Sequence, residues 1–81
     1  MKNSTNRNRP LVLLKLKDVV LRTRLSRSSI YNKLDTNSPY YDSKFPRQVS
    51  LGAISVAWVE KEIEEWIESR IKMRKEASGE G

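Results

Sequence analysis

Four residues in one short predicted helix carry side chains that can hydrogen-bond to nucleic-acid bases or phosphates. The guanidinium of Arg27 can pair with O6 and N7 of guanine, and the amide of Asn32 can pair with N6 and N7 of adenine. Ser28 can contact either kind of base edge, while Tyr31 can donate its hydroxyl to a phosphate or serve a purely structural role. This is the chemistry of a helix that enters the major groove of DNA.

The spacing of apolar residues places these side chains on the outer face of their helix. Ser26 stands where a hydroxyl caps a helix, and Ile30 and Leu34 follow at the i, i+4 spacing of a buried face, so a helix should end near Leu34. Just upstream, residues 17–23 show a second short apolar pattern at helical spacing, and a tight connection joins the two segments. The sequence therefore predicts two short helices that meet at a turn.

A loop and a β-hairpin are expected next. Residues 36–46 contain Pro39, Pro46 and several turn-forming residues, which predicts an irregular loop whose aromatic side chains partly dock on the domain. Residues 48–51 then alternate polar with apolar, and residues 55–58 can return the chain after a turn in which Gly52 would adopt a positive φ. This hairpin would be a wing beside the second helix.

The C-terminal part predicts a long helix over residues 59–76. Its apolar residues recur at helical spacing, its first turn is acidic and its last turns are basic, as the helix dipole favours. Its glutamates are interpreted as a solvated face, not as paired catalytic or metal-binding carboxylates. Trp58 and Trp66 are interpreted as core residues, although a pair of tryptophans can also stack on single-stranded bases.

The two ends of the chain complete the predicted organisation. Residues 1–10 are expected to form a flexible basic N-terminal arm, residues 11–76 the folded domain, and residues 77–81 a disordered tail. Residues 11–16 are mostly apolar and fit either a short strand or an extended lead-in.

Composition limits the chemistry that the chain can perform. An 81-residue chain encloses one small core, and without Cys or His it has neither a thiolate nucleophile nor an imidazole base. We therefore expect neither an enzyme nor a bound cofactor or metal. Residues 1–57 hold eleven basic and three acidic residues, whereas residues 58–81 hold five and seven. Such a basic half is typical of nucleic-acid binders, although ribosomal and membrane-surface proteins share it.

Together these patterns favour an α+β, mostly helical fold: a small winged helix-turn-helix with two short helices, a hairpin wing and a long C-terminal helix. Lys33 and Lys44 would contact the DNA backbone or remain solvated. The predicted DNA contacts are Arg27, Ser28, Tyr31, Asn32, Lys33, Lys44, Arg47, Gln48 and Ser50.

Several short motifs, in order, resemble the AlpA family of phage and prophage regulators, which have a winged helix-turn-helix related to MerR-type and excisionase domains. The matching segments, spread over about residues 14–70, are residues 25–31, 38–46, 51–52, 55–60 and 62–63, with Trp66. The resemblance implies DNA binding by the second helix and the wing, and transcriptional control of phage or mobile-element genes.

The chain departs from the family pattern at two positions. Arg24 stands in the turn where the family commonly has Gly, which predicts altered turn geometry or modest strain. A basic residue is common in the family near Ile54 at the wing tip; its absence here makes Arg47 the better wing contact.

The sequence thus predicts a sequence-specific, double-stranded DNA-binding regulator of a phage, prophage or other mobile element, located in the cytoplasm on the bacterial nucleoid. A chain this small would need a homodimer, cooperative assembly or a partner such as RNA polymerase or an integrase. Two alternatives remain open at this point. The chain could be an architectural factor that bends DNA for an integrase, or an adaptor whose acidic helix binds a protein. No membrane association is expected.

Overall fold

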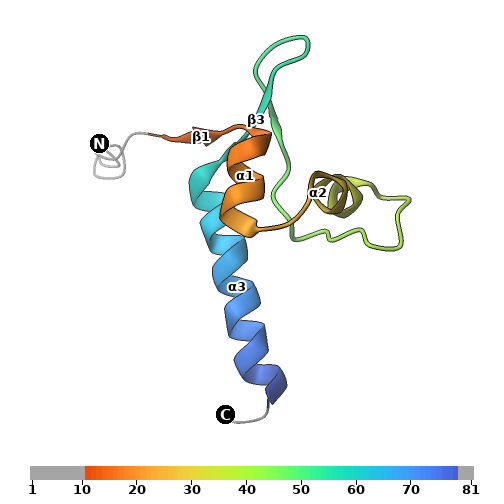
Figure 1. Cartoon of the computed structure of the whole chain (residues 1–81), viewed down its shortest axis with the longest axis vertical. Coiled ribbons are helices and arrows are strands. Elements are labelled where there is room, and N and C mark those ends of the chain that lie inside the picture. The colour runs from red at the N-terminus through yellow and green to blue at the C-terminus, as the bar shows by residue number, and fades with distance from the viewer. Residues whose placement is uncertain (1–10, 79–81) are drawn as a thin grey trace, which may run out of the picture.

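The computed structural model describes residues 11–78, so the predicted arm at residues 1–10 and the last three residues of the predicted tail lie outside the described part. The elements follow in the order β1 (Leu13–Leu14), α1 (Leu16–Thr23), α2 (Arg27–Leu34), β2 (Val49–Ser50), β3 (Val56–Val59) and α3 (Glu60–Ser78). This is the predicted α+β arrangement, with two short helices, a hairpin and a long final helix (Figure 1).

The three strands form one small antiparallel sheet in the order β1-β3-β2. Leu14 pairs with Trp58 in β3, so residues 11–16 contain a short strand of two residues, one of the two forms that their sequence fits. The predicted hairpin is also confirmed, because Ser50 in β2 pairs with Val56 in β3.

The turn of this hairpin differs from the prediction at Gly52, whose φ lies outside the positive range. The amide of Leu51 donates to the carbonyl of Ser55 at 2.7 Å. This hydrogen bond closes a loop that is longer than a two-residue turn. Gly52 therefore does not serve this turn by adopting a positive φ.

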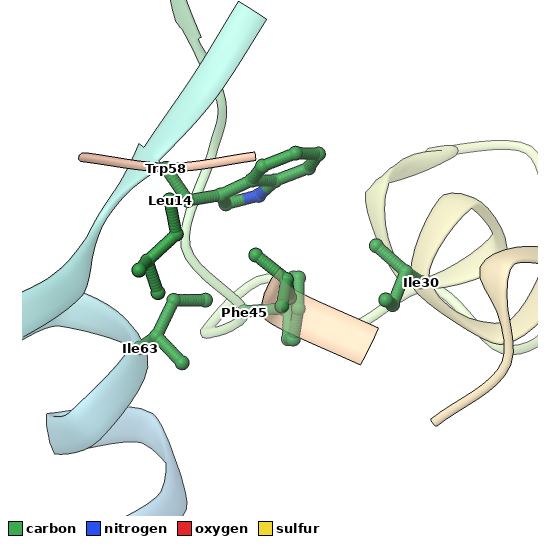
Figure 2. Packing of buried hydrophobic residues seen from close by; sticks show 6 residues of the cluster. Leu14, Ile30, Phe45, Trp58 and Ile63 are labelled. Atoms are coloured by element: carbon green, nitrogen blue, oxygen red, sulfur yellow. The ribbon is translucent and has the colours of Figure 1, made fainter. Parts of the chain in front are cut away.

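Six buried side chains pack together in the core, and they come from β1, α1, α2, the loop after α2, β3 and α3 (Figure 2). Trp58 and Ile63 are fully buried beside Leu14, which confirms the core assignment of Trp58. Phe45 is the loop residue that docks there, whereas Tyr40 and Tyr41 stay exposed. The core residues are Leu14, Val19, Ile30, Phe45, Trp58 and Ile63.

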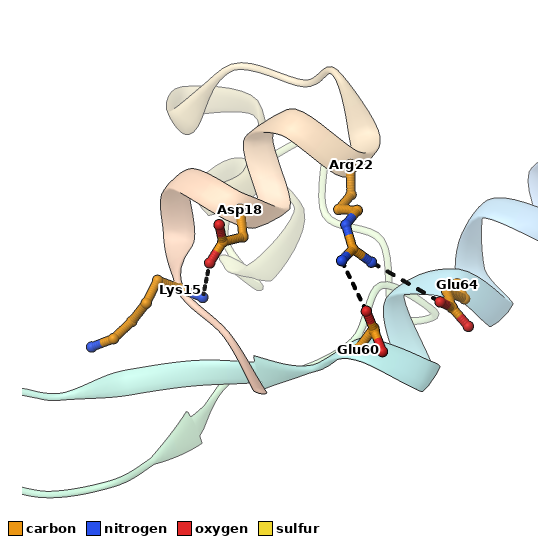
Figure 3. Close-up of polar contacts among 5 residues, drawn as sticks. All are labelled: Lys15, Asp18, Arg22, Glu60 and Glu64. Carbon is orange, nitrogen blue, oxygen red and sulfur yellow. Dashed lines mark hydrogen bonds and ion pairs between the residues drawn. The ribbon is translucent and has the colours of Figure 1, made fainter. Parts of the chain in front are cut away.

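Polar contacts fix α1 at both of its ends (Figure 3). Asp18 Oδ2 accepts a hydrogen bond of 3.0 Å from the amide of Lys15, which satisfies a free N–H at the start of the helix. Near the other end, Arg22 Nη2 lies 2.8 Å from Glu60 Oε2, and Arg22 Nη1 lies 4.0 Å from Glu64. These partly exposed ion pairs hold α1 against the start of α3.

Helix α3 begins one residue later and ends two residues later than predicted, since Val59 still belongs to β3 and pairs with Leu13. The predicted apolar stripe is buried only in its first half. Ile63 is buried and Ile67 is half-buried, but Ile71 is 48% exposed. The C-terminal half of α3 extends away from the other elements, so no core covers it (Figure 1).

Candidate nucleic-acid interface

The start of α2 is capped as the sequence predicts. Ser26 Oγ accepts a hydrogen bond of 3.1 Å from the amide of Ser29, and the Ser29 hydroxyl lies 3.1 Å from the same oxygen. The first turn of α2 holds no acidic residue, so nothing in it repels a phosphate from the positive end of the helix dipole. The N-terminus of α2 can therefore lie next to the phosphates of a polyanion without electrostatic repulsion from its own first turn.

One face of α2 is free while the other enters the core. Ile30 is fully buried and Leu34 is partly buried against the core cluster. Arg27, Ser28 and Tyr31 are exposed, and their i, i+1 and i+4 positions group them along one exposed side of the helix, next to the buried face. The structure therefore brings together three of the five predicted DNA-contacting residues of this helix.

Asn32 lies at the flank of that face and is half-buried. Its Oδ1 accepts a long hydrogen bond of 3.4 Å from the hydroxyl of Ser38, in the loop after α2. Bidentate pairing with adenine uses both the oxygen and the nitrogen of the amide. The bond from Ser38 occupies one of the two lone pairs of Oδ1 and ties the amide to the loop, so Asn32 is less free to contact a base than Arg27 or Ser28.

Lys33 points elsewhere. Its Nζ lies 5.6 Å from the ring centroid of Trp66 in α3, a cation–π arrangement, and its side chain is half-buried. On the same ring, the guanidinium carbon of Arg70 lies 5.8 Å from the centroid. Lys33 thus faces α3, away from the exposed side that holds Arg27 and Tyr31.

Trp66 is half-buried and is the centre of a cluster that connects α2, its following loop and α3. The ring of Phe45 meets it edge-on at 5.0 Å, and its indole Nε1 donates to Asp42 Oδ2 at 3.1 Å. Asp42 also accepts at Oδ1 from the amide of Lys44, and its own amide donates to the carbonyl of Lys33. Nothing in the local sequence signals this cluster, because Asp42 and Trp66 are 24 residues apart.

The pKa of Asp42 lies below its ordinary value of 3.8. Burial alone would raise this pKa, because it disfavours the charged carboxylate. The hydrogen bonds from the Lys44 amide and the Trp66 indole lower the pKa and outweigh the effect of burial. The positive charges of Lys33 and Arg70 lower it further. Asp42 is therefore held as a carboxylate at the centre of the cluster.

The turn between α1 and α2 contains the strain that the family comparison predicts. Arg24 has φ 64° and ψ 19°, the left-handed conformation, and is the one non-glycine residue with positive φ in the described part of the chain. Thr23 supports the turn, since its hydroxyl donates to the carbonyl of Val19 and accepts from the amide of Leu25. Arg24 thus adopts a conformation that glycine would adopt at lower cost.

The start of the hairpin adjoins the C-terminal end of α2. Arg47 and Gln48 line a small hollow together with Leu34, and both are exposed. Lys44 is exposed in the preceding loop, and the Ser50 hydroxyl donates to the carbonyl of Gly52 at 3.2 Å. Of the predicted wing residues, Arg47 and Gln48 thus lie next to α2, while Ser50 is engaged inside the hairpin.

The described residues contain neither a membrane-spanning helix nor a group of metal ligands. No helix among them is long and apolar enough to cross a bilayer. Within the same part of the chain, no three His, Cys, Asp or Glu residues gather where they could hold a metal ion.

The chain is similar in sequence to known proteins over most of its length. A family model described as "Prophage CP4-57 regulatory protein (AlpA)" matches residues 12–71. A protein of Escherichia coli K12 named DNA-binding transcriptional activator AlpA is 43% identical over 61 residues, which cover 75% of this chain and 87% of that protein. The uncharacterized protein ORF88 of Enterobacteria phage P4 is 39% identical over 62 residues, 76% of this chain and 64% of the phage protein. No solved structure matches the chain significantly. The chain belongs to the AlpA family of prophage regulatory proteins.

Proposed function

We propose that this protein is a DNA-binding transcriptional regulator of a phage or prophage, and that it inserts α2 into the major groove. The observation that carries the proposal is the exposed face of α2, where Arg27, Ser28 and Tyr31 lie together beyond a capped N-terminus. The name of the Escherichia coli relative, a DNA-binding transcriptional activator, supports the same assignment.

Each exposed residue of α2 has a chemically defined role in this proposal. Arg27 is the candidate for bidentate pairing with guanine, and Ser28 is the candidate for a second base edge. Tyr31 donates its hydroxyl to a phosphate, which positions the helix without contributing sequence preference. Asn32 holds the following loop through Ser38 and is a weaker candidate for pairing with adenine.

Arg47 and Gln48 extend the interface beyond the end of α2. Both are exposed beside Leu34, so a duplex held by α2 meets them at its phosphate backbone or the next minor groove. Lys44 adds a further positive charge near them. Lys33 contributes to the field of this surface from its place over Trp66 without contacting a base.

The size of α2 requires a second source of affinity. Its eight residues span about 12 Å at about 1.5 Å per residue, which covers three or four base pairs at about 3.4 Å each. A second copy on a repeated site or a DNA-bound partner such as RNA polymerase would supply the remaining affinity. Regulation therefore depends on how several copies or partners occupy one promoter region.

Fluorescence anisotropy tests the proposal. The protein is titrated into duplexes from the region upstream of its own gene and into scrambled duplexes of equal length, at about 150 mM salt. We expect at least about a thousandfold preference for one upstream duplex. Equal affinity for all duplexes would refute sequence-specific regulation.

An architectural role in excision is the second candidate. The apolar tip of the hairpin, at Leu51 and Ile54, favours it because apolar residues in a minor groove bend DNA. An excision assay with a neighbouring integrase, with and without this protein, separates this role from control of transcription.

A further inference from the structure

The tip of the β2–β3 hairpin exposes two large apolar side chains. Ile54 is 92% exposed and Leu51 is 51% exposed, and residues 48–59 contain no charged side chain. A single exposed apolar residue is ordinary on a protein surface, but two at the end of a projection form a contact surface.

This tip is a defined structure that stands clear of the domain. The hydrogen bond from the Leu51 amide to Ser55 closes it, and the Ser50 hydroxyl donates to the carbonyl of Gly52. A Cβ atom placed on Gly52 would meet nothing within 4 Å, so nothing packs against the turn there. The hairpin projects at the opposite end of the molecule from the free half of α3 (Figure 1).

The length of the hairpin matches the spacing of DNA grooves. Its start adjoins the end of α2, at Arg47 and Leu34. From Val49 to Gly52 the strand advances about 10 Å at about 3.3 Å per residue. The major groove is about 12 Å wide. With α2 in that groove, a projection of this length is long enough to reach the flanking minor groove.

We propose that Ile54, supported by Leu51, enters this flanking minor groove as an apolar wedge and bends the duplex. The inference rests on the DNA-binding function proposed above and adds a contact to it. Isoleucine and leucine are among the side chains that proteins insert between base steps, where partial unstacking kinks the duplex by about 20° or more. The uncharged tip makes this contact nearly independent of salt, unlike a contact made by lysine.

The charge around the hairpin favours DNA over a second copy of the chain as the occupant. Residues 43–59 contain the basic residues Lys44 and Arg47 and no acidic residue. Two such hairpins brought tip to tip would place like charges near each other, whereas a polyanion is attracted to the same surface.

The test compares the wild type with Ile54→Ser and Ile54→Lys on the preferred duplex. Ile71→Ser is the matched control, because Ile71 is also an exposed isoleucine but lies on the far half of α3. Anisotropy gives Kd over a range of salt concentrations, and fluorescence energy transfer between the duplex ends gives the bend. Circular dichroism checks that each variant is folded.

We expect Ile54→Ser to weaken binding about tenfold or more and to reduce the bend, because a fully buried isoleucine side chain contributes at least that much. Ile54→Lys should regain affinity at low salt with a salt slope steeper by about one, but without the bend. Ile71→Ser should match the wild type in both measurements.

Two results would overturn the inference while leaving the proposed function intact. One is that Ile54→Ser binds the preferred duplex with the same Kd and the same bend as the wild type. The other is an unchanged first complex with loss of a second, cooperative one, which would assign the tip to a contact between protein copies. If the wild type binds no duplex, the proposed function itself fails.

Discussion

The indole Nε1 of Trp66 donates a 3.1 Å hydrogen bond to the carboxylate of Asp42 and thereby joins α3 to the loop that follows α2. The amide of Asp42 donates in turn to the carbonyl of Lys33, in the last turn of α2. The orientation of the proposed recognition helix is therefore set at its C-terminal end by α3. The packing of Ile30 in the core also fixes the orientation of this helix.

Trp66→Phe removes the indole donor while keeping an aromatic ring against Phe45. A hydrogen bond to a carboxylate is stronger than one between neutral groups, and Asp42 is half-buried, so the free energy of unfolding should fall by about 1–2 kcal/mol. Urea unfolding followed by circular dichroism measures it. Tyr40→Phe, at an exposed loop position, should stay within about 0.5 kcal/mol of the wild type. Equal midpoints for Trp66→Phe and Tyr40→Phe would contradict a stabilising bond.

Asp42→Asn tests the same cluster through pH. Because folding lowers the pKa of Asp42 below 3.8, its charge stabilises the fold at pH values above the unfolded pKa. This contribution is lost as pH falls below about 4 and through the folded pKa. The stability difference between wild type and Asp42→Asn should therefore be constant above about pH 5 and shrink in acid. A difference that grows in acid would reverse the sign of the pKa shift.

Arg24→Gly should stabilise the protein. A left-handed residue other than glycine costs about 1–2 kcal/mol, and glycine gives back about 0.5–1 kcal/mol through its greater freedom in the unfolded chain. The net gain should be about 0.5–1 kcal/mol, visible as a higher urea midpoint. Arg24→Ala removes the same charge but keeps the side-chain Cβ, so it should show no such gain. Similar gains in both variants would attribute the effect to charge instead of backbone strain.

Two serines of α2 should separate folding from binding. Ser26→Ala removes the oxygen that caps the helix, so stability should fall by about 1 kcal/mol. Ser28→Ala changes an exposed side chain and should alter stability by less than about 0.5 kcal/mol while weakening binding to the preferred duplex. Thermal melts and anisotropy on both variants give the comparison. A stability loss in Ser28→Ala as large as that in Ser26→Ala would place Ser28 in the fold.

Arg27→Ala and Arg47→Ala should affect binding in different ways. Loss of Arg27 should cost about 1–3 kcal/mol on the preferred duplex and relax the preference at one base pair. Loss of Arg47 should weaken preferred and scrambled duplexes alike and reduce the salt slope by about one. Asn32→Ala serves as a comparison, because its bond to Ser38 predicts a loss of stability with little change in base preference. A clear change of base preference in Asn32→Ala would show that this bond opens on DNA.

The sequence determined the elements and the outer face of α2. Hydrophobic spacing at Ile30 and Leu34, and the hydroxyl of Ser26, are local signals, because helix periodicity and capping act within one or two turns. They placed Arg27, Ser28 and Tyr31 on the exposed side, as the structure has them. The alternating strand ending in Trp58 likewise indicated the hairpin and part of the core.

Only the tertiary structure decided which polar residues of α2 and its loop are already occupied. Lys33 lies over Trp66, and Asn32 accepts from Ser38, although their positions in the sequence resemble those of free surface residues. The bond between Asp42 and Trp66 likewise joins segments that no local periodicity relates. The physical reason is that such contacts depend on how the loop packs against α3, whereas helix faces depend on spacing within a few residues. The sequence thus fixes which way α2 faces, and packing decides which of its side chains remain free to bind.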